Sequence, residues 1–510
     1  MAGTSATLDP RAVRFGDREQ IAHAPAGRLA RRPWIVVAAL MGVAVAIRLL
    51  LVRGIWVDEA ISIHQAHMSL PGMLADLRAT DNHPPLYFLI LWATTRALGY
   101  GELAVRLPSI VAGTLLVPSL FLAGRALFDR RTGLLAAALG SVAPLVVWYS
   151  QEARMYALVM LFVTLAVWAQ ARILSDGRPR YWVAYAVFAI ALIYTNYFAA
   201  IAIAIQQVAF GVAVWRRAHR GEDVRHLVTG IWITWVALVA AIAPLAPFAL
   251  DQFHHNQAGG FENLPSAGAP GAGAGSGLSV YALISNVVWA IWGYHADSTM
   301  LRIAALWPML MLVALLFLGR GRSPRTGYLV AMAVVPILTL FTIGLLKREL
   351  FEVRYFAVAV PMLFLLLARV LNSEAVRKLP LAVATLAVFA SLFVGLADQQ
   401  LSNNNPRDYD FRGAIEKIDA QARPGDTVLF APSFLRDVVG YYGPRLSLRP
   451  LGSPQPNVPG SGHVFLIASF LQDDPSLATE VGSARWNLGH GARRLISTND
   501  DHQIQVWEFG

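Results

Sequence analysis

The chain has 510 residues, of which 56% are hydrophobic and 15% are charged, and its mean hydropathy is +0.50. Soluble domains carry roughly a quarter charged residues, so this composition excludes an ordinary soluble protein and indicates a membrane protein. The net charge of +10 lies in short basic clusters between apolar runs, a pattern that orients membrane proteins and argues against nucleic-acid binding, and the absence of cysteine excludes disulfides and thiolate chemistry.

The chain begins with a polar, arginine-bearing stretch, residues 1–33, which we expect to be a cytoplasmic tail. The apolar run at 34–52 follows it. This run is too long for the core of a signal peptide and lacks a small-residue cleavage site, so it predicts an uncleaved first membrane-spanning helix.

Six basic clusters lie between the apolar runs, and we expect all of them to face the cytoplasm. An even number of spans must then separate neighbouring clusters, which predicts about eleven membrane-spanning helices and places everything after residue 397 outside. Two short runs, 84–99 and 278–294, are assigned to interfacial helices on the outer face. The expected crossings are 34–52, 104–126, 132–148, 155–173, 181–198, 199–216, 227–249, 300–318, 326–346, 355–371 and 379–397.

This topology predicts a transmembrane region at 34–397 with four outer-face loops, 53–102, 148–154, 251–299 and 347–354. The composition changes at 398, where a turn-rich linker begins. Helical spacing at 410–422 and 475–488 and strand patterns at 425–432, 463–470 and 504–509 predict a small extracytoplasmic α/β domain over 398–510.

Two adjacent acids, Asp58 and Glu59, follow the first span in "GIWVDEAISI". An aspartate at the centre of a bilayer costs roughly 2.5 to 3.5 kcal/mol, and a position at the membrane edge avoids most of that cost. The acids have two ordinary explanations as well, namely solvated loop carboxylates or a pair that complements the dipole at a helix N-terminus.

Three more polar segments fall on the predicted outer face. In "DNHPPLYF", Asp81 and His83 precede an expected helix start. In "WYSQEARMYAL", Gln151, Glu152 and Arg154 lie at the mouth of a span, where a structural ion pair is the alternative. The aromatic residues Trp148 and Tyr149 of that segment are expected to belong to the interfacial belt.

The last of these segments is "KRELFEVRYF", which places Lys347, Arg348 and Arg354 outside the membrane. Basic residues on the outer face oppose the usual orientation rule, so we expect an anionic partner, for which a lipid phosphate is suitable. Contact with outer-leaflet headgroups is the simpler alternative.

These segments, together with "RLPSIVAGTLLVPSLFLAGRALF" at 106–128, resemble the polyprenyl-phosphate-sugar-dependent glycosyltransferases of the GT-C superfamily. The likeness is greatest to bacterial family 39-like enzymes, which are related to protein O-mannosyltransferases and to the lipid A aminoarabinose transferase. It is strong over 50–160, weaker to about 400, and does not extend to the tail. The "QEAR" motif departs from protein O-mannosyltransferases, which argues against a protein acceptor.

The resemblance implies a helical GT-C fold and an inverting glycosyltransferase at the outer face of the plasma (inner) membrane. The sugar, mannose or arabinose-like, would move from a polyprenyl-phosphate donor to a hydroxyl of a cell-envelope glycan, lipid or protein. The alternatives from other classes are a transporter or flippase for lipid-linked sugars, which would favour inverted repeats and ionisable residues at mid-span, and a membrane-anchored glycan-binding module.

The resemblance also implies roles for individual residues. Asp58 would be the catalytic base, with Glu59 beside it, and Glu152 a further catalytic acid. Mg²⁺ or Mn²⁺ bridging Asp58 and Glu152 is compatible with these carboxylates, and the sequence strictly implies neither ion. The residues expected to bind the donor phosphate are His83, Arg154, Lys347, Arg348, Arg354 and Tyr355, and those expected to support the site or the acceptor are Asp81 and Gln151.

Overall fold

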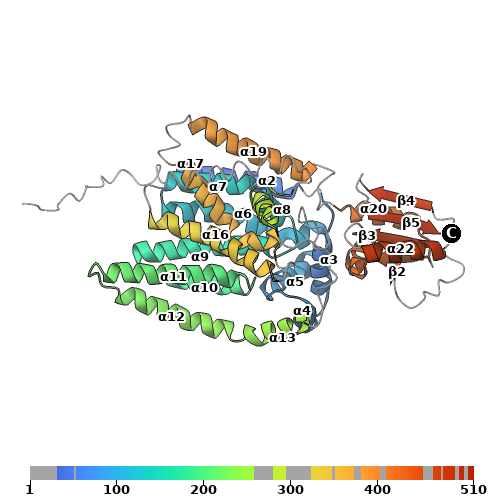
Figure 1. Cartoon of the computed structure of the whole chain (residues 1–510), viewed down its shortest axis with the longest axis horizontal. Helices are drawn as coiled ribbons and strands as arrows, with labels where there is room; N and C mark the ends of the chain where they lie inside the picture. Colours follow the sequence, from blue (N-terminus) through green and yellow to red (C-terminus); the bar gives the residue numbers. More distant parts are fainter. Residues whose placement is uncertain are drawn as a thin grey trace, which may run out of the picture.

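In the computed structural model, the apolar runs form helices that lie side by side, and the C-terminal part forms a small sheet at one end of them (Figure 1). The structure describes residues 32–50, 53–257, 279–294, 323–346, 351–372, 381–401, 409–424, 426–451, 463–471, 475–488, 493–498 and 504–509.

The apolar helices of the membrane region follow the predicted crossings. Within the described residues, five helices are long and apolar enough to span a bilayer, and a bent pair could form a sixth span. The number of about eleven crossings stays a prediction, and the expected crossing at 300–318 lies outside the described residues. The helices are α2 (Arg32–Leu49), α6 (Glu102–Leu127), α7 (Arg130–Val142), α8 (Pro144–Ser150), α9 (Tyr156–Asp176), α10 (Pro179–Ile193), α11 (Ala199–Ala218), α12 (Arg225–Ile242), α13 (Leu245–Gln257), α14 (Val280–Trp292), α16 (Pro324–Gly344), η2 (Val353–Val358), α17 (Val360–Leu371) and α19 (Leu381–Leu401).

Two predicted crossings are interrupted by proline. The run at 132–148 is divided at Pro144 into α7 and α8, which are bent by 59°. Helix α8 continues to Ser150, so the prediction of a loop at 148–154 is wrong for its first three residues. The run at 227–249 is divided near Pro244 into α12 and α13, because proline cannot donate the backbone hydrogen bond that a continuous helix needs.

A buried arginine stabilises the bend between α7 and α8. The guanidinium of Arg48, in the last turn of α2, donates to the carbonyl of Ser141 at 3.1 Å and to the hydroxyl of Ser150 at 3.1 Å. Within a bilayer, backbone groups released by a helix break need partners from the protein. Arg48 therefore supplies donors on both sides of the break.

The predicted first outer loop folds into three short helices, α3 (Val57–His67), α4 (Leu70–Thr80) and α5 (Leu86–Leu98). Ser69 caps the N-terminus of α4, and its hydroxyl accepts from the amide of Gly72 at 3.3 Å. In Figure 1 these helices lie at the end of the helical bundle that adjoins the C-terminal sheet. They bring the polar segments of the loop to that end.

The C-terminal part forms the predicted small α/β domain. Its five strands have the order β2-β1-β3-β5-β4, with β1 parallel to β2 and β3, and β5 antiparallel to β3 and β4. The short β2 and the strand β4 were not predicted. The elements are α20 (Phe411–Asp419), β1 (Thr427–Ala431), η3 (Ser433–Leu435), α21 (Arg436–Tyr442), β2 (Ser447–Pro450), β3 (Val464–Ser469), α22 (Pro475–Leu488), β4 (Arg493–Thr498) and β5 (Ile504–Phe509).

Candidate functional site

A polar and aromatic cavity lies where α3, α8, α9, η2 and the C-terminal linker meet. Four of the predicted site residues line it, and they come from three segments that are far apart in the sequence. The lining residues are Arg53, Gly54, Trp56, Asp58, Glu59, Trp148, Tyr149, Glu152, Tyr156, Tyr294, Arg354 and Tyr409.

Asp58 and Arg354 form an ion pair in this cavity. A terminal nitrogen of Arg354 donates to Oδ2 of Asp58 at 2.6 Å, and its Nε donates to Glu352. The Asp58 and Arg354 side chains are 17% and 18% exposed, so the pair is shielded yet reachable from the cavity. Burial opposes the charge of Arg354, but Glu352 and Asp58 raise the pKa of the guanidinium and keep it protonated.

Glu152 has a different environment in the same cavity. Its side chain is 8% exposed, and among the described residues its carboxylate has no hydrogen-bonding or ion-pair partner. Burial raises the pKa of Glu152 to about 7, the carboxylates of Glu59 and Asp58 add to the rise, and Arg354 and Arg53 oppose it. A carboxyl group that titrates near neutral pH suits proton transfer.

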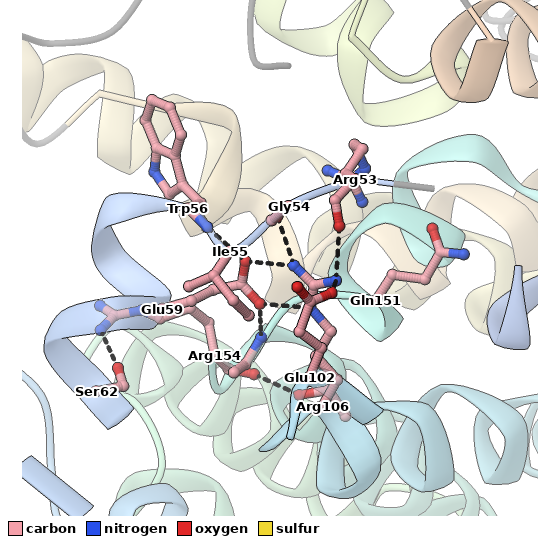
Figure 2. Close-up of polar contacts among 12 residues, drawn as sticks. Arg53, Gly54, Ile55, Trp56, Glu59, Ser62, Glu102, Arg106, Gln151 and Arg154 are labelled. Carbon is pink, nitrogen blue, oxygen red and sulfur yellow. Dashed lines mark hydrogen bonds and ion pairs between the residues drawn. The ribbon is translucent and has the colours of Figure 1, made fainter. Parts of the chain in front are cut away.

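Glu59 is held in a buried network, as Figure 2 shows. Arg106 of α6 donates to both carboxylate oxygens of Glu59, at 2.7 and 2.8 Å, and the amide of Ala153 donates to one of them at 2.7 Å. The other oxygen accepts from the amide of Trp56 at 2.9 Å and so caps the N-terminus of α3. Glu59 therefore joins three segments of the site while it also lines the cavity.

Asp81, His83 and Arg154 form a second polar group beside α3. Nδ1 of His83 lies 2.7 Å from Oδ1 of Asp81, and a terminal nitrogen of Arg154 donates to the hydroxyl of Ser62 at 2.9 Å. Burial lowers the pKa of His83 although Asp81 opposes this effect, so near pH 7 the neutral ring donates to Asp81. The ordinary interpretation of this segment as a helix start also holds, since α5 begins at Leu86.

Gln151 and Tyr355 lie outside the cavity lining. The side-chain Nε2 of Gln151 donates to the carbonyl groups of Ile47 at 3.1 Å and Leu50 at 2.9 Å, which ties the end of α8 to the end of α2. The ring of Tyr355 packs against the ring of Phe198, with 4.8 Å between the ring centroids. Lys347 and Arg348 lie outside the described residues.

Aromatic residues make up much of the cavity wall, and the sequence analysis did not identify them as site residues. Trp148 and Tyr149 are buried, at 5% and 2% exposed, so the expectation that they form an interfacial belt is wrong. The guanidinium of Arg53 lies 3.2 Å from the ring centroid of Trp148. Tyr156 has a buried hydroxyl with no hydrogen-bonding partner in the described part of the chain. The signal that could have identified these aromatic residues is their closeness in the sequence to the acidic residues of the site.

The donor set for a metal ion is small. No group of three or more histidine, aspartate or glutamate side chains within the described ranges could hold a metal ion. Asp58 and Glu152 line the same cavity, so two carboxylates are present for an ion that completes its shell with water or substrate.

Residues 82–248 match the family model of dolichyl-phosphate-mannose-protein mannosyltransferases. A comparison with curated proteins finds no match. Among solved structures, ArnT from Cupriavidus metallidurans in the apo state matches with a TM-score of 0.58 and 14% identity over 94% of this chain and 98% of ArnT. The same protein bound to undecaprenyl phosphate matches with a TM-score of 0.54 and 13% identity over the same shares of the chains.

A further similar structure is that of the archaeal oligosaccharyltransferase AglB from Archaeoglobus fulgidus, in complex with an inhibitory peptide and a dolichol-phosphate. Its TM-score is 0.54 and its identity 12%, over 89% of this chain and 71% of AglB. These likenesses confirm the predicted GT-C fold. The family-model match over residues 82–248 supports a glycosyltransferase activity, and the apolar helices support a multi-pass membrane protein.

Proposed function

We propose that the chain transfers a sugar, mannose or arabinose-like, from a polyprenyl phosphate to a hydroxyl of a cell-envelope glycan, lipid or protein. The reaction takes place at the outer face of the plasma membrane, with the N-terminus in the cytoplasm and residues 398–510 outside. The same fold in ArnT with undecaprenyl phosphate and in AglB with a dolichol-phosphate supports a lipid phosphate as the donor group.

The observation that carries this proposal is the Asp58–Arg354 ion pair in a cavity beside membrane helices. In the reaction, the acceptor oxygen bonds to the anomeric carbon of the sugar while the bond from that carbon to the phosphate oxygen breaks. The bonding electrons leave with the lipid phosphate, and the acceptor proton passes to a base. The site must therefore hold both a proton acceptor and a cation.

Asp58 serves as the base and Arg354 stabilises the leaving phosphate. In the free site the two side chains neutralise each other at 2.6 Å. When the donor phosphate binds Arg354, Asp58 loses part of its positive partner and becomes a better proton acceptor. Attack from the face opposite the departing phosphate inverts the anomeric configuration.

Glu152 and Tyr156 complete the polar wall around the sugar. Because burial raises the pKa of Glu152 to about 7, this carboxyl group can donate a hydrogen bond when protonated and accept one when ionised. The Tyr156 hydroxyl lacks a partner within the described residues, so a donor oxygen can satisfy it. Glu59 acts through Arg106 and Ala153 to hold α3 to α6 and to the segment between α8 and α9.

The test uses the purified full chain in nanodiscs, with undecaprenyl-phosphoryl mannose and undecaprenyl-phosphoryl arabinose as separate radiolabelled donors. The acceptor is the envelope fraction of a host strain that lacks this protein. The proposal predicts that label moves from one donor to the envelope fraction and that undecaprenyl phosphate is released in equal amount. Mass spectrometry of the product then identifies the acceptor.

Two results would contradict the proposal. One is the recovery of both donors intact after incubation with active membranes. The other is movement of a lipid-linked sugar across a liposome bilayer without its consumption, which would favour the transporter alternative. Parallel reactions with EDTA decide the metal question, since undiminished transfer after complete chelation excludes a catalytic ion.

A further inference from the structure

Two parts of the protein hold the segment 53–55, which precedes Trp56. The first of them is helix α6. Arg106, which is 2% exposed, donates to the carbonyl of Arg53 at 3.0 Å and to the carbonyl of Gly54 at 2.8 Å (Figure 2). The same guanidinium pairs with Glu59. Arg106 thus fixes the backbone of this segment against the transmembrane region.

The second part is the C-terminal domain. The amide of Ile55 donates to the hydroxyl of Tyr442, at the end of α21, at 2.6 Å, and that hydroxyl donates to Oε1 of Glu102 at 2.8 Å. Arg412 of α20 donates to Oε2 of Glu102 and, at 3.4 Å, to the carbonyl of Arg53. We call Tyr442, Arg412 and Glu102 the clamp.

The close approach of the two regions is visible at Gly54 as well. A Cβ atom at this position would lie 3.3 Å from the Tyr442 hydroxyl and 3.5 Å from Cβ of Arg412. A side chain larger than hydrogen would therefore press on the clamp. Ile55 is fully buried, so its amide needs the Tyr442 hydroxyl because water cannot replace it.

The clamped segment leads directly into the cavity. Arg53 and Gly54 line the cavity, and Asp58 lies in the first turn of α3, three residues after Ile55. Tyr409, from the linker that precedes α20, adds a further part of the wall. The C-terminal domain therefore touches the site both through the backbone before α3 and through a lining residue.

We infer that Tyr442, Arg412 and Glu102 are positioning residues through which the C-terminal domain sets the place of Asp58 and Arg53 in the active site. This inference rests on the proposed function for its catalytic consequence. The domain is then a part of the catalytic unit, and its docking is a condition for transfer. A displacement of a reacting group by about 1 Å can cost about 100-fold in rate.

The chain offers a matched pair of tyrosines for the test. Tyr442→Phe removes the hydroxyl between Ile55 and Glu102. Tyr441→Phe removes the neighbouring hydroxyl, which donates to the carbonyl of Tyr100 at 2.8 Å and also joins the domain to the membrane region. Only the first hydroxyl touches the segment that leads to Asp58.

The experiment measures two properties of full-length wild type and both variants in nanodiscs. One is hydrogen exchange of the peptide that begins at Arg53 and includes α3. The other is kcat and KM for transfer from whichever undecaprenyl-phosphoryl sugar the wild type uses. For Tyr442→Phe we expect faster exchange and a kcat lowered by about 10- to 100-fold, with KM changed less than threefold. Tyr441→Phe should match the wild type in both.

Equal exchange and equal kcat in the two variants would overturn the inference. If Tyr442→Phe fails to fold, Glu102→Gln replaces it, since this change keeps an acceptor for Tyr442 and removes the charge that pairs with Arg412. Absence of transfer by the wild type would count against the proposed function alone. The exchange measurement would then still decide whether Tyr442 holds the segment.

Discussion

Arg354 and Asp58 are 296 positions apart in the sequence, and their side chains meet at 2.6 Å. The contact joins η2, which precedes α17, to the first turn of α3. Each partner is less than one-fifth exposed, and both line one cavity. A carboxylate that can take a proton and a guanidinium that can hold a phosphate are thus placed together before any substrate binds.

Replacement of Arg354 by alanine should lower kcat by about 100-fold or more, because the leaving phosphate loses the cation that stabilises it. Arg354→Lys keeps the charge but loses the forked geometry of the guanidinium, so we expect an intermediate rate. Arg78→Ala is the control, since Arg78 of α4 forms an exposed ion pair with Asp251 of α13. Equal kcat values for Arg354→Ala and Arg78→Ala would refute this role.

Binding of the donor should depend on pH through Glu152. As the pH falls through about 7, Glu152 takes up a proton and the cavity loses a negative charge, so affinity for a phosphodiester donor should rise. Glu152→Gln should bind undecaprenyl-phosphoryl mannose with the same affinity across this range. Titrations at about pH 6 and pH 8 measure the difference. A wild-type affinity that does not change between them would argue against titration of Glu152.

The same group gives a second readout in the stability of the protein. The pKa of Glu152 is raised from 4.5 in the unfolded chain to about 7 in the folded protein, so the folded state binds more protons between these values. Stability should therefore decrease as the pH rises through this window and then level off. The melting temperature of Glu152→Gln should fall less than that of the wild type as the pH rises through this window.

Glu59→Gln should destabilise the protein by roughly 3 to 5 kcal/mol, because the buried Arg106 would lose its hydrogen-bonded anionic partner and keep only the more distant Glu102, at 3.9 Å. Asp251→Asn removes one partner of the exposed Arg78–Asp251 pair and should change stability by about 1 kcal/mol at most. Melting temperatures of both variants in the same detergent provide the comparison. A Glu59→Gln protein as stable as Asp251→Asn would show that the buried pair is not essential to the fold.

An engineered disulfide should join the C-terminal domain to the cavity segment. Cβ atoms at 54 and 412 would be 3.5 Å apart, which is within the usual range for a disulfide of about 3.5 to 4.5 Å. The native chain has no cysteine, so the pair Gly54→Cys and Arg412→Cys would have no competitor. Mass spectrometry of the oxidised protein should find the linked peptides, with each single variant as control. Failure to form the link would argue against the docked arrangement.

Much of the fold could be predicted from the sequence because apolar run length and basic clusters are strong signals in membrane proteins. The helix breaks at Pro144 and Pro244 were missed, although the prolines are visible, because an apolar run of sufficient length was treated as one helix. Strand β2 was missed because it is short, largely exposed and ends at Pro450, so it shows no alternation.

The site could be predicted in part. Asp58, Glu152 and Arg354 stood out as charges at membrane edges, and all three line the cavity. Arg106 was missed because it lies within an apolar run. Its partner, Glu59, is 47 positions away in the sequence. Neighbouring residues on a helix point about 100° apart, so Asp58 and Glu59 must have different partners, but the sequence does not say which partners.

The contacts of the C-terminal domain with the site could not be predicted at all. Tyr442 and Glu102 are 340 positions apart, and neither belongs to a segment that carries a recognisable motif. Such pairing depends on how two folded regions dock, and local sequence patterns hold no information about it.

The most direct test of the account is label transfer from an undecaprenyl-phosphoryl sugar to the envelope fraction by Asp58→Asn and by the wild type in identical nanodiscs. Asparagine keeps the shape of the side chain and cannot take the acceptor proton, so we predict a kcat lowered by about 10² to 10⁴ with unchanged membrane insertion. Transfer by Asp58→Asn at the wild-type rate would contradict the assignment of Asp58 as the base.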